Sequence, residues 1–376
     1  MATQAPEKAD RRTIPILPEA PATIPIPFRG EIRREDGHWL DLFGRPLTDL
    51  RISVTDHCNF RCRYCKPKEI WDNFDAYLPY EELLSFEELF RISRIAVANG
   101  VRKIRLTGGE PLLRRHVEEL VALLRALRTP SGDPIDIAMT TNGSILAKKA
   151  KALKAAGLDR LTVSLDAMDE RIFQSFNDVG FPVAKVLEGI RAAQEAGFTK
   201  IKVNTVVKRG VNEGEIIPLL EHFKGTGIIV RFIEYMDAGS SNGWKMDQVV
   251  PTSEVLRIAG SRYKLRPLTP NYASETAQRW QYGEDGDEFG CISSVTRPFC
   301  RNCSRARLSI EGAVYLCLFA ERGFDIRTML RGGASDEEIT EALGRIWSGR
   351  TDHYSELRQN GMPLPARKVE MSYIGG

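Results

Sequence analysis

Two groups of cysteines are the residues of this sequence whose types and spacing most clearly suggest chemistry. Cys58, Cys62 and Cys65 form the first group, with three and then two residues between them. Clustered cysteines at such spacing bind metal or do redox work, whereas disulfide frameworks belong to short secreted chains. The first group therefore predicts a metal site or an iron–sulfur cluster.

Two kinds of site fit this first group. A structural zinc ion takes four closed ligands, and His57 could supply the fourth. An iron–sulfur cube held by three thiolates would instead keep one iron open to a chelating molecule. We favour the cube, because three cysteines on one short loop are unusual for zinc and because Tyr64 precedes the last cysteine.

The second group lies far along the chain and comprises Cys300, Cys303 and Cys317. Cys291 lies nearby and would complete a four-cysteine zinc site, which is the alternative to a second cube with an open iron. Arg305 and Arg307 follow Cys303 on either side of Ala306 and would bring two guanidiniums beside the metal. Guanidinium forks suit phosphate or carboxylate oxygens, and surface ion pairs are the alternative.

Alternating strand-like and helical segments, from about Leu47 onward, must position these groups. Apolar strand-like runs lie at 48–54, 101–107, 135–141, 158–165, 199–207 and 228–235. Helical runs lie at 85–98, 114–128, 145–155, 183–195 and 213–224. Strand–helix–strand units at this spacing predict right-handed crossovers and a parallel sheet. An open partial barrel and a doubly wound sheet both fit the pattern, whereas six strands are too few for an eight-stranded barrel.

Polar residues stand at the carboxyl ends of five of these strands. They occupy the stretches 55–58, 107–111, 140–143, 164–166 and 234–236. The carboxyl ends of parallel strands form one face of an α/β fold, and active sites lie on that face. We therefore expect one site there, with the first cysteine group directly after the first strand.

The composition is that of a globular protein of 376 residues, with 53 basic and 50 acidic side chains. A net charge of +3 gives no support to a nucleic-acid or membrane-surface partner. No apolar run of about 18 residues and no secretory signal is visible, so we expect a cytoplasmic protein. Three segments are predicted: a proline-rich, disordered extension at 1–45, an α/β segment at 46–240, and a C-terminal domain at 241–376.

The first cysteine group and a glycine-rich strand end together resemble the radical S-adenosylmethionine (SAM) superfamily. The stretches that carry this resemblance are 58–65 (CNFRCRYC) and 108–111 (GGEP). The resemblance implies a partial (β/α)6 TIM-like barrel with a C-terminal iron–sulfur domain. It also implies a [4Fe–4S] cluster whose open iron binds SAM and whose electron releases a 5′-deoxyadenosyl radical. SAM would be contacted by Tyr64, Gly109, Ser164 and Met236, and the glycines would let backbone approach its methionyl part.

Further stretches are similar to the GTP 3′,8-cyclase family, radical SAM lyases that begin molybdenum cofactor biosynthesis. They are Arg51, 103–111 (KIRLTGGEP), 140–143 (TTNG), 163–166 (VSLD), 200–205 (KIKVNT), 231–236 (RFIEYM), 300–307 (CRNCSRAR) and 372–376 (SYIGG). This resemblance covers about 47–376 and implies conversion of GTP to 3′,8-cyclo-7,8-dihydro-GTP. The radical would remove the hydrogen at C3′ of the ribose, and this carbon would then attack C8 of guanine.

The same resemblance implies roles for individual residues. The SAM-cleaving cluster would be held by Cys58, Cys62 and Cys65, and a second [4Fe–4S] cluster, whose open iron meets guanine, by Cys300, Cys303 and Cys317. GTP would be bound by Arg51, Arg105, Thr140, Lys202, Arg305, Ala306 and Arg307, with Arg231 as a further cation. The terminal Gly375 and Gly376 would reach into the active site. The expected partners are GTP, an unidentified electron donor and a second copy of the chain in a homodimer.

Two other functions stay compatible with parts of the pattern. Another radical SAM enzyme with an auxiliary cluster, such as a peptide-modifying one, would carry more cysteines in its C-terminal region. It would also give no reason for the Arg305–Arg307 stretch or for the terminal glycines. A structural zinc protein that binds nucleic acid would need a basic surface interleaved with aromatic residues. Cys291 lies outside the family pattern and would block guanine binding if it were a fourth ligand.

Overall fold

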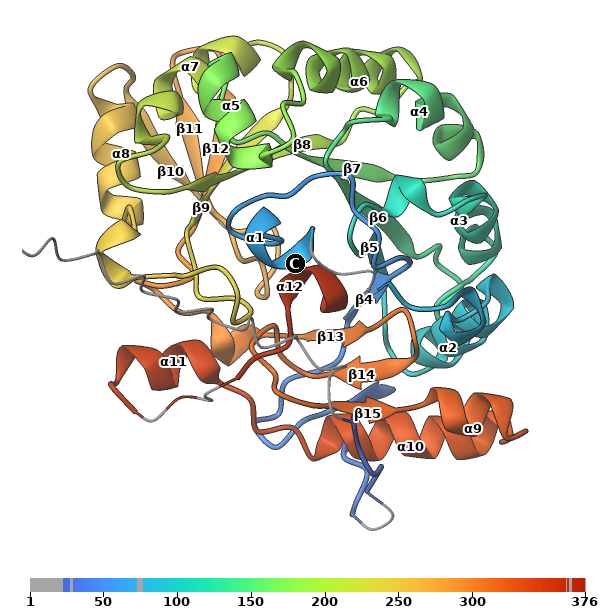
Figure 1. The fold of residues 1–376 in the computed structure, drawn as a ribbon. Helices are drawn as coiled ribbons and strands as arrows, with labels where there is room; N and C mark the ends of the chain where they lie inside the picture. Colours follow the sequence, from blue (N-terminus) through green and yellow to red (C-terminus); the bar gives the residue numbers. More distant parts are fainter. Residues whose placement is uncertain (1–22, 28–29, 73–76, 363, 365–366, 376) are drawn as a thin grey trace, which may run out of the picture.

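Six parallel strands that follow one another in the chain form the centre of the molecule. The computed structural model describes residues 23–27, 30–72, 77–362, 364 and 367–375. The strands are β4 (Asp49–Ser53), β5 (Lys103–Thr107), β6 (Asp136–Thr141), β7 (Arg160–Ser164), β8 (Ile201–Val207) and β9 (Ile229–Glu234). Each pairs in parallel with the next, and together they curve around a central space (Figure 1). The predicted partial barrel is thereby confirmed.

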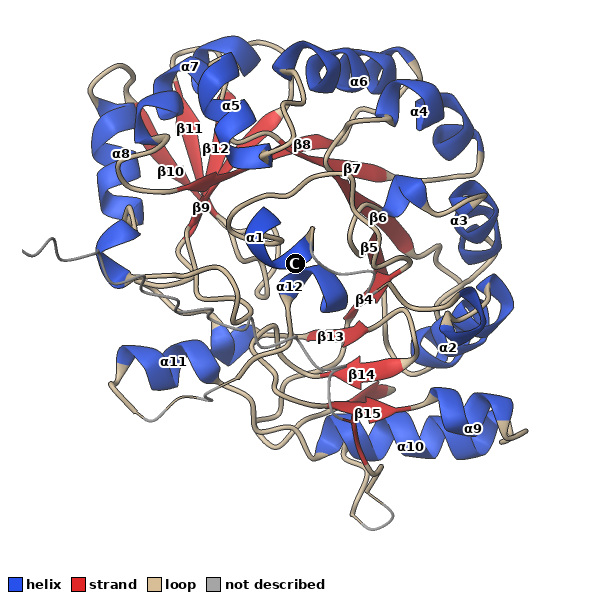
Figure 2. Cartoon of the chain, in the orientation of Figure 1, coloured by secondary structure: helices blue, strands red, loops and turns tan. Residues whose placement is uncertain are grey.

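Helices cover the outside of this curved sheet (Figure 2). They are α2 (Phe86–Ala98), α3 (Val117–Arg125), α4 (Leu146–Ala155), α6 (Val183–Glu195) and α7 (Ile216–Phe223). The five helical segments expected between the strands are thus present, and α2 begins with the capping box of Ser85 and Glu88. An additional helix, α5 (Glu170–Asn177), follows β7, where none was predicted. Its N-terminus is capped by Asp169, whose carboxylate accepts hydrogen bonds from two backbone N–H groups.

Residues after 240, joined by residues 23–24, extend the same sheet at both of its edges. On one side β13 (Arg305–Leu308) pairs in parallel with β4, and on the other side β12 (Asp287–Ile292) pairs in parallel with β9. The outer strands are β14 (Ala313–Tyr315), β15 (Gly323–Asp325) and β1 (Thr23–Ile24) beyond β13, and β11 (Gln278–Tyr282) and β10 (Leu265–Leu268) beyond β12. The second cysteine group therefore lies beside the barrel wall.

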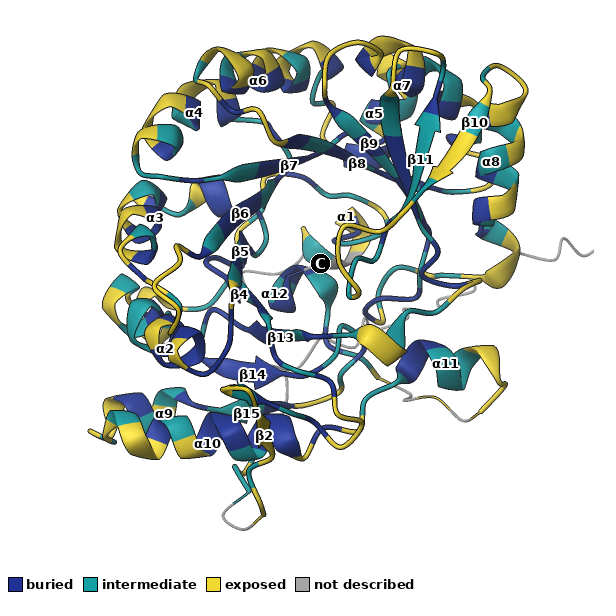
Figure 3. Ribbon diagram, turned by 180° about the vertical axis from the view of Figure 1, so that it is seen from behind, coloured by how far each residue is buried: buried dark blue, intermediate teal, exposed yellow. Residues whose placement is uncertain are grey.

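The other described elements are short or peripheral. Helices lie at α1 (Lys68–Trp71), α8 (Thr252–Gly260), α9 (Arg327–Arg331), α10 (Asp336–Ser348), α11 (Tyr354–Gln359) and α12 (Met371–Ile374). Two strands, β2 (Arg34–Glu35) and β3 (His38–Trp39), form a separate hairpin. Short 3-10 turns lie at 80–82, 111–113, 213–215, 246–248 and 300–302. Seen from either side, α12 lies within the ring of strands (Figures 1 and 3).

The segment before residue 46 differs from the expected disordered extension where it is described. β1 joins the sheet by pairing with β15, and Trp39 is fully buried in the main hydrophobic cluster. Asp41 and Arg45 are buried as well. The prolines that suggested disorder concentrate before residue 28, so the more apolar residues behind them can pack. Residues 1–22 lie outside the described part of the chain.

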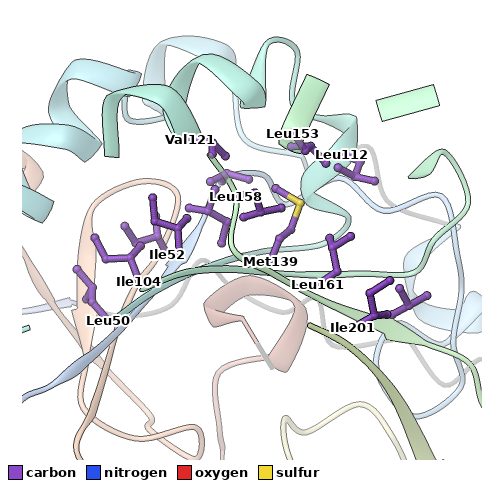
Figure 4. Packing of buried hydrophobic residues seen from close by; sticks show 14 of the residues in the cluster. Leu50, Ile52, Ile104, Leu112, Val121, Met139, Leu153, Leu158, Leu161 and Ile201 are labelled. Atoms are coloured by element: carbon purple, nitrogen blue, oxygen red, sulfur yellow. The ribbon is translucent and has the colours of Figure 1, made fainter. Parts of the chain in front are cut away.

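Side chains alternate along each strand and so divide the barrel into two faces. Leu50, Ile52, Ile104, Met139 and Leu161 point outward and pack beneath the helices (Figure 4). The residues between them on the strands face the inside of the barrel, because successive strand side chains point to opposite faces. Most of these inward residues are polar or charged.

Candidate active site

The inside of the barrel holds a cavity of about 720 Å³. Both cysteine groups line it, although one follows β4 and the other lies next to β13. Nearly all site residues expected from the sequence line it too: Cys58, Cys62, Cys65, Cys300, Cys303, Cys317, Tyr64, Gly109, Ser164, Met236, Arg51, Arg105, Thr140, Lys202, Arg231, Arg305 and Arg307. Among the residues expected to bind GTP, Ala306 is the exception, because its side chain points to the outer face of β13 and packs in the hydrophobic core.

The two glycines at the end of β5 hold the first cysteine loop in place. Gly109 N–H donates to the Thr55 carbonyl at 2.8 Å, and Glu110 N–H donates to the His57 carbonyl at 2.7 Å. A Cβ at Gly109 would lie 2.2 Å from the His57 oxygen, and one at Gly108 would lie 2.3 Å from the Thr55 oxygen. Glycine is therefore required by contact with the cysteine loop itself, whatever its role toward SAM.

The three cysteines of the first group are partly buried. Burial raises the pKa of Cys58 and Cys62, and it raises the pKa of Cys65 to about 12. These thiols are thus protonated until a metal displaces the protons. His57, the fourth ligand of the zinc alternative, is half-exposed and stacks on Tyr77 with ring centroids 3.8 Å apart.

The separation of the three cysteines distinguishes a zinc site from an iron–sulfur cluster. Within the described ranges, no three His, Cys, Asp or Glu side chains converge as ligands of a single ion. The thiols of the first group are nevertheless close enough to raise one another's pKa. An iron–sulfur cube takes each thiolate on a different iron, so it suits three separated thiols. The donor set of three thiols therefore fits a cube better than a zinc ion.

The second cysteine group is surrounded by positive charge. Burial alone would raise the pKa of Cys303, but the guanidiniums of Arg305 and Arg350 outweigh it and lower this pKa to about 6. At Cys317 the nearby positive charge does not outweigh burial, and burial raises its pKa to about 12. Cys291 is buried on β12 opposite Phe232 of β9, packs in the hydrophobic core and does not line the cavity. The second group therefore has three cysteines in the site.

Basic side chains from neighbouring strands form a layer inside the barrel. In the strand register, Arg51 lies opposite both Arg307 and Arg105, so three arginines stand side by side on three strands. Burial and the neighbouring cations lower the pKa of Arg51, and they lower the pKa of Lys202 to about 8 and of Arg231 to about 9. Crowded cations whose charge is disfavoured in this way would be stabilised by a multiply charged anion.

The hydrogen bonding of these arginines is incomplete. Four of them have a buried Nε that finds no acceptor among the described residues: Arg51, Arg105, Arg160 and Arg231. An unpaired buried donor costs about 1–3 kcal/mol. Four such donors on four strands, all facing one cavity, indicate a binding site for a ligand with several acceptor oxygens.

Two of the basic residues in this layer were given no role from the sequence. Lys103 of β5 donates to Asp49 of β4 at 2.5 Å, and Arg160 of β7 contacts Asp136 of β6. Both line the cavity. The signal that could have revealed them is the strand alternation, because each stands two residues before an inward-facing residue, Arg105 or Thr162.

A buried carboxyl lies beside the first cysteine loop. The Tyr64 hydroxyl donates to Asp166 Oδ2 at 3.1 Å, and Val206 N–H donates to Asp166 Oδ1 at 2.8 Å. Burial raises the pKa of Asp166 to about 7 despite these two donors. Tyr64 is thereby fixed next to Cys65, on the side of the cavity where Ser164 and other strand-end residues gather.

The C-terminal helix α12 borders the same cavity, whereas Gly375, which was expected to reach the site, is not among its lining residues. Met371 and Ser372 of α12 line it, and Arg307 Nη1 donates to the carbonyl oxygens of Ile374 and Gly375. Gly375 has a φ of 72° and lies against Thr107 at the end of β5, so close that a Cβ would clash with it. Gly376 lies outside the described residues. Arg307, which was expected to bind GTP, thus contacts the C-terminal residues through these hydrogen bonds.

Comparison with known proteins agrees with this geometry. Residues 52–223 match the family described as the Radical SAM superfamily, and residues 228–356 match the family described as Molybdenum Cofactor Synthesis C. The crystal structure of Streptococcus suis SuiB bound to S-adenosylmethionine has a similar fold, with a TM-score of 0.56 and 15% identity over 88% of this chain and 78% of that one. The chain is a radical SAM enzyme, a class that uses a [4Fe–4S] cluster and SAM.

Closer relatives define the family. The chain is 49% identical to the GTP 3′,8-cyclase of Acidothermus cellulolyticus over 89% of this chain and 98% of that relative. It is 46% identical to the GTP 3′,8-cyclase of Staphylococcus epidermidis strain RP62A over the same shares. The chain belongs to the GTP 3′,8-cyclase family, as its motifs predicted. Within the described ranges, none of its helices combines the length and the apolar character that a bilayer crossing requires.

Proposed function

We propose that this chain converts GTP to 3′,8-cyclo-7,8-dihydro-GTP, the first step of molybdenum cofactor biosynthesis. The observation that carries the proposal is the single cavity that both cysteine groups and the layer of incompletely bonded arginines share. A nucleoside triphosphate offers what each part lacks: a base for the second cluster, a ribose between the two groups, and phosphate oxygens for the guanidiniums.

The first cysteine group is proposed to hold the cluster that binds SAM. When bound, this cluster and SAM supply the 5′-deoxyadenosyl radical that takes the C3′ hydrogen of GTP before the ring closes at C8. Tyr64, Gly109, Ser164 and Met236 are the proposed contacts of SAM, since all four line the cavity and, like the first cysteine group, lie at or just after the carboxyl ends of barrel strands. The buried Asp166 holds the Tyr64 hydroxyl, and so fixes the ring orientation beside Cys65.

The second cysteine group is proposed to hold another [4Fe–4S] cluster at which guanine binds. Its fit is supported by the lowered pKa of Cys303, which favours the thiolate that iron needs. The core position of Cys291 supports an iron left open for the base. Orientation of the base here and of the phosphates elsewhere would fix which ribose hydrogen faces the radical.

The triphosphate is proposed to bind the basic layer. Arg51, Arg105, Lys202 and Arg231 reach the cavity from four barrel strands, and Arg305 and Arg307 reach it from β13. Thr140 supports this set by accepting a hydrogen bond from Arg105 Nη1 at 3.0 Å. The guanidinium group of Arg105 is therefore held in place in the ligand-free protein. An external one-electron donor and a homodimer, both carried over from the family, complete the proposal.

The test is formation of 5′-deoxyadenosine from SAM by reduced, anaerobically reconstituted protein, with and without GTP. We expect GTP to stimulate this cleavage strongly. Replacing both Cys300 and Cys303 with alanine should leave slow cleavage that no longer responds to GTP. Cys291→Ala is the matched control and should respond like the unmodified chain, because Cys291 lies outside the cavity. If the unmodified chain cleaves SAM at the same rate with and without GTP, it is a radical SAM enzyme whose substrate is not GTP.

A further inference from the structure

Three buried charged residues contact the second cysteine group, and one of them, Arg350, also lines the cavity. They are Asp41, Arg45 and Arg350, with exposures of 0%, 5% and 2%. Asp41 Oδ2 accepts hydrogen bonds from Arg45 Nε at 2.5 Å and from Arg350 Nη1 at 3.3 Å. Its other oxygen accepts from the backbone N–H groups of Phe43 and Arg45 at 2.9 and 2.8 Å. One carboxylate thus fixes two guanidiniums that come from opposite ends of the chain.

The two guanidiniums reach every segment that carries a cysteine of this group. Arg45 Nη1 donates to the Cys300 carbonyl at 2.8 Å. Arg350 Nη1 donates to the Cys303 carbonyl at 2.8 Å, and its Nη2 donates to the Cys303 sulfur at 3.2 Å. Arg350 Nε donates to the carbonyl of Leu316, the residue before Cys317, at 3.0 Å. Hydrogen bonds from one rigid network therefore set the positions of all three cysteines.

Stability alone gives a weak reason for such a network. Desolvating two guanidiniums and a carboxylate is costly, and apolar residues of similar volume often replace a buried ion pair without loss. What apolar residues cannot supply is a set of N–H donors aimed at cysteine carbonyls and at a sulfur. Partners of this outer kind orient metal ligands and tune the metal.

We propose that Asp41, Arg45 and Arg350 form a clamp that sets the spacing of Cys300, Cys303 and Cys317 for the second iron–sulfur cluster. The inference rests on the proposed function, because it assumes that this cluster forms. The bond from Arg350 to the Cys303 sulfur also gives the clamp an electronic role. N–H donors to cluster sulfurs stabilise the more negative, reduced state, so they raise the reduction potential.

The test uses the full chain with Cys58, Cys62 and Cys65 replaced by alanine, so that all bound iron belongs to the second site. In this background Arg350→Lys keeps the positive charge but removes the guanidinium group that makes several hydrogen bonds at once. Asp41→Asn removes the carboxylate that holds both arginines. We expect each to lower iron and sulfide per chain at least threefold after reconstitution. The cluster that remains in Arg350→Lys should show a lower midpoint potential in a redox titration followed by electron paramagnetic resonance.

Arg262→Gln is the matched control, because Arg262 makes an exposed ion pair with Glu221, and it should change neither quantity. Folding is checked by placing Arg350→Lys in the chain with the first cysteine group intact, where the iron of the first cluster should be retained. Unchanged iron content and potential in Arg350→Lys would overturn the clamp while keeping the second cluster. A background chain that binds no iron at all would overturn the second cluster, and the clamp with it.

Discussion

Arg51 of β4 and Arg105 of β5 lie directly opposite each other in the strand register, and both line the same cavity. Two guanidiniums in neighbouring register positions repel each other, and each keeps an Nε without an acceptor in the described structure. A fold that places them together gains nothing from the pair itself. Asp49 offsets part of this crowding of positive charge, and a bound anion would offset more of it.

Replacing Arg51 with methionine should stabilise the ligand-free protein, because a half-buried charge crowded by other cations gives way to an apolar side chain of similar length. We expect a gain on the order of 1 kcal/mol in the free energy of unfolding. The same change should weaken GTP binding at least tenfold, about 1.4 kcal/mol. Thermal unfolding with and without GTP measures both effects. Arg257→Met, at an exposed arginine, serves as the control. A variant that is less stable but keeps the full GTP-induced shift would contradict the assignment.

GTP affinity should fall as the pH rises through about 8. Burial, and then the charge of Arg231, lower the pKa of Lys202 from 10.5 to about 8, so its ammonium is lost in that range. Between pH 8 and 10.5 the unfolded chain binds the proton more tightly, so the contribution of Lys202 to ligand-free stability rises with pH there. Affinity and this contribution thus change in opposite directions.

The measurement for Lys202 is the GTP-induced shift in melting temperature as a function of pH. Lys202→Arg is the control, because a guanidinium stays charged across this range and should flatten the profile. An equally steep loss of affinity in Lys202→Arg would assign the titration to another group.

Gly109→Ala should impair assembly of the first cluster. The new Cβ would meet the His57 carbonyl at 2.2 Å and push the cysteine loop away from β5. We expect the iron bound at the first site to fall by more than half, measured in a background without the second cysteine group. Gly214→Ala is the control, since a Cβ there meets nothing within 4 Å. Normal iron content in Gly109→Ala would show that the loop tolerates displacement.

Deleting Gly375 and Gly376 should lower GTP turnover about tenfold, roughly 1.4 kcal/mol, without unfolding the protein. Arg307 binds the carbonyls of Ile374 and Gly375, so the deletion and Arg307→Ala remove parts of the same contact. Their effects should therefore be less than additive, with a coupling energy of about 0.5–3 kcal/mol. Full turnover after the deletion, or strict additivity, would separate the chain end from Arg307.

The barrel could be predicted from sequence because each strand carries its own signal. β8, for example, alternates buried and half-buried residues along its whole length, and glycines mark the helix ends. α5 was missed because most of its residues are polar, although Asp169 offers an N-cap signal. The segment around Trp39 was misjudged because the prolines before it dominated the composition.

The candidate site was predictable in its cysteines and in those basic residues that lie in recognisable motifs. Arg160 lies outside these motifs, and only the inside of the barrel reveals it. The contact between Asp41 and Arg350 joins residues 309 positions apart, and no local pattern encodes such a pairing. A strand can be recognised from the pattern of residues next to one another in the sequence. The residues around a cluster, in contrast, come from segments that are distant in the sequence and meet only in the fold.

The pairing of β13 with β4 also governs how the protein is made. β4 is synthesised well before its partner β13, because strands β5 to β12 lie between them in the chain, so one edge of the nascent sheet stays unpaired while those strands are made. Open strand edges are sites of aggregation, and contacts between distant segments slow folding. The first cysteine loop follows β4 directly and is therefore also made before β13 and α12, and the open edge of β4 needs protection from other chains until β13 pairs with it.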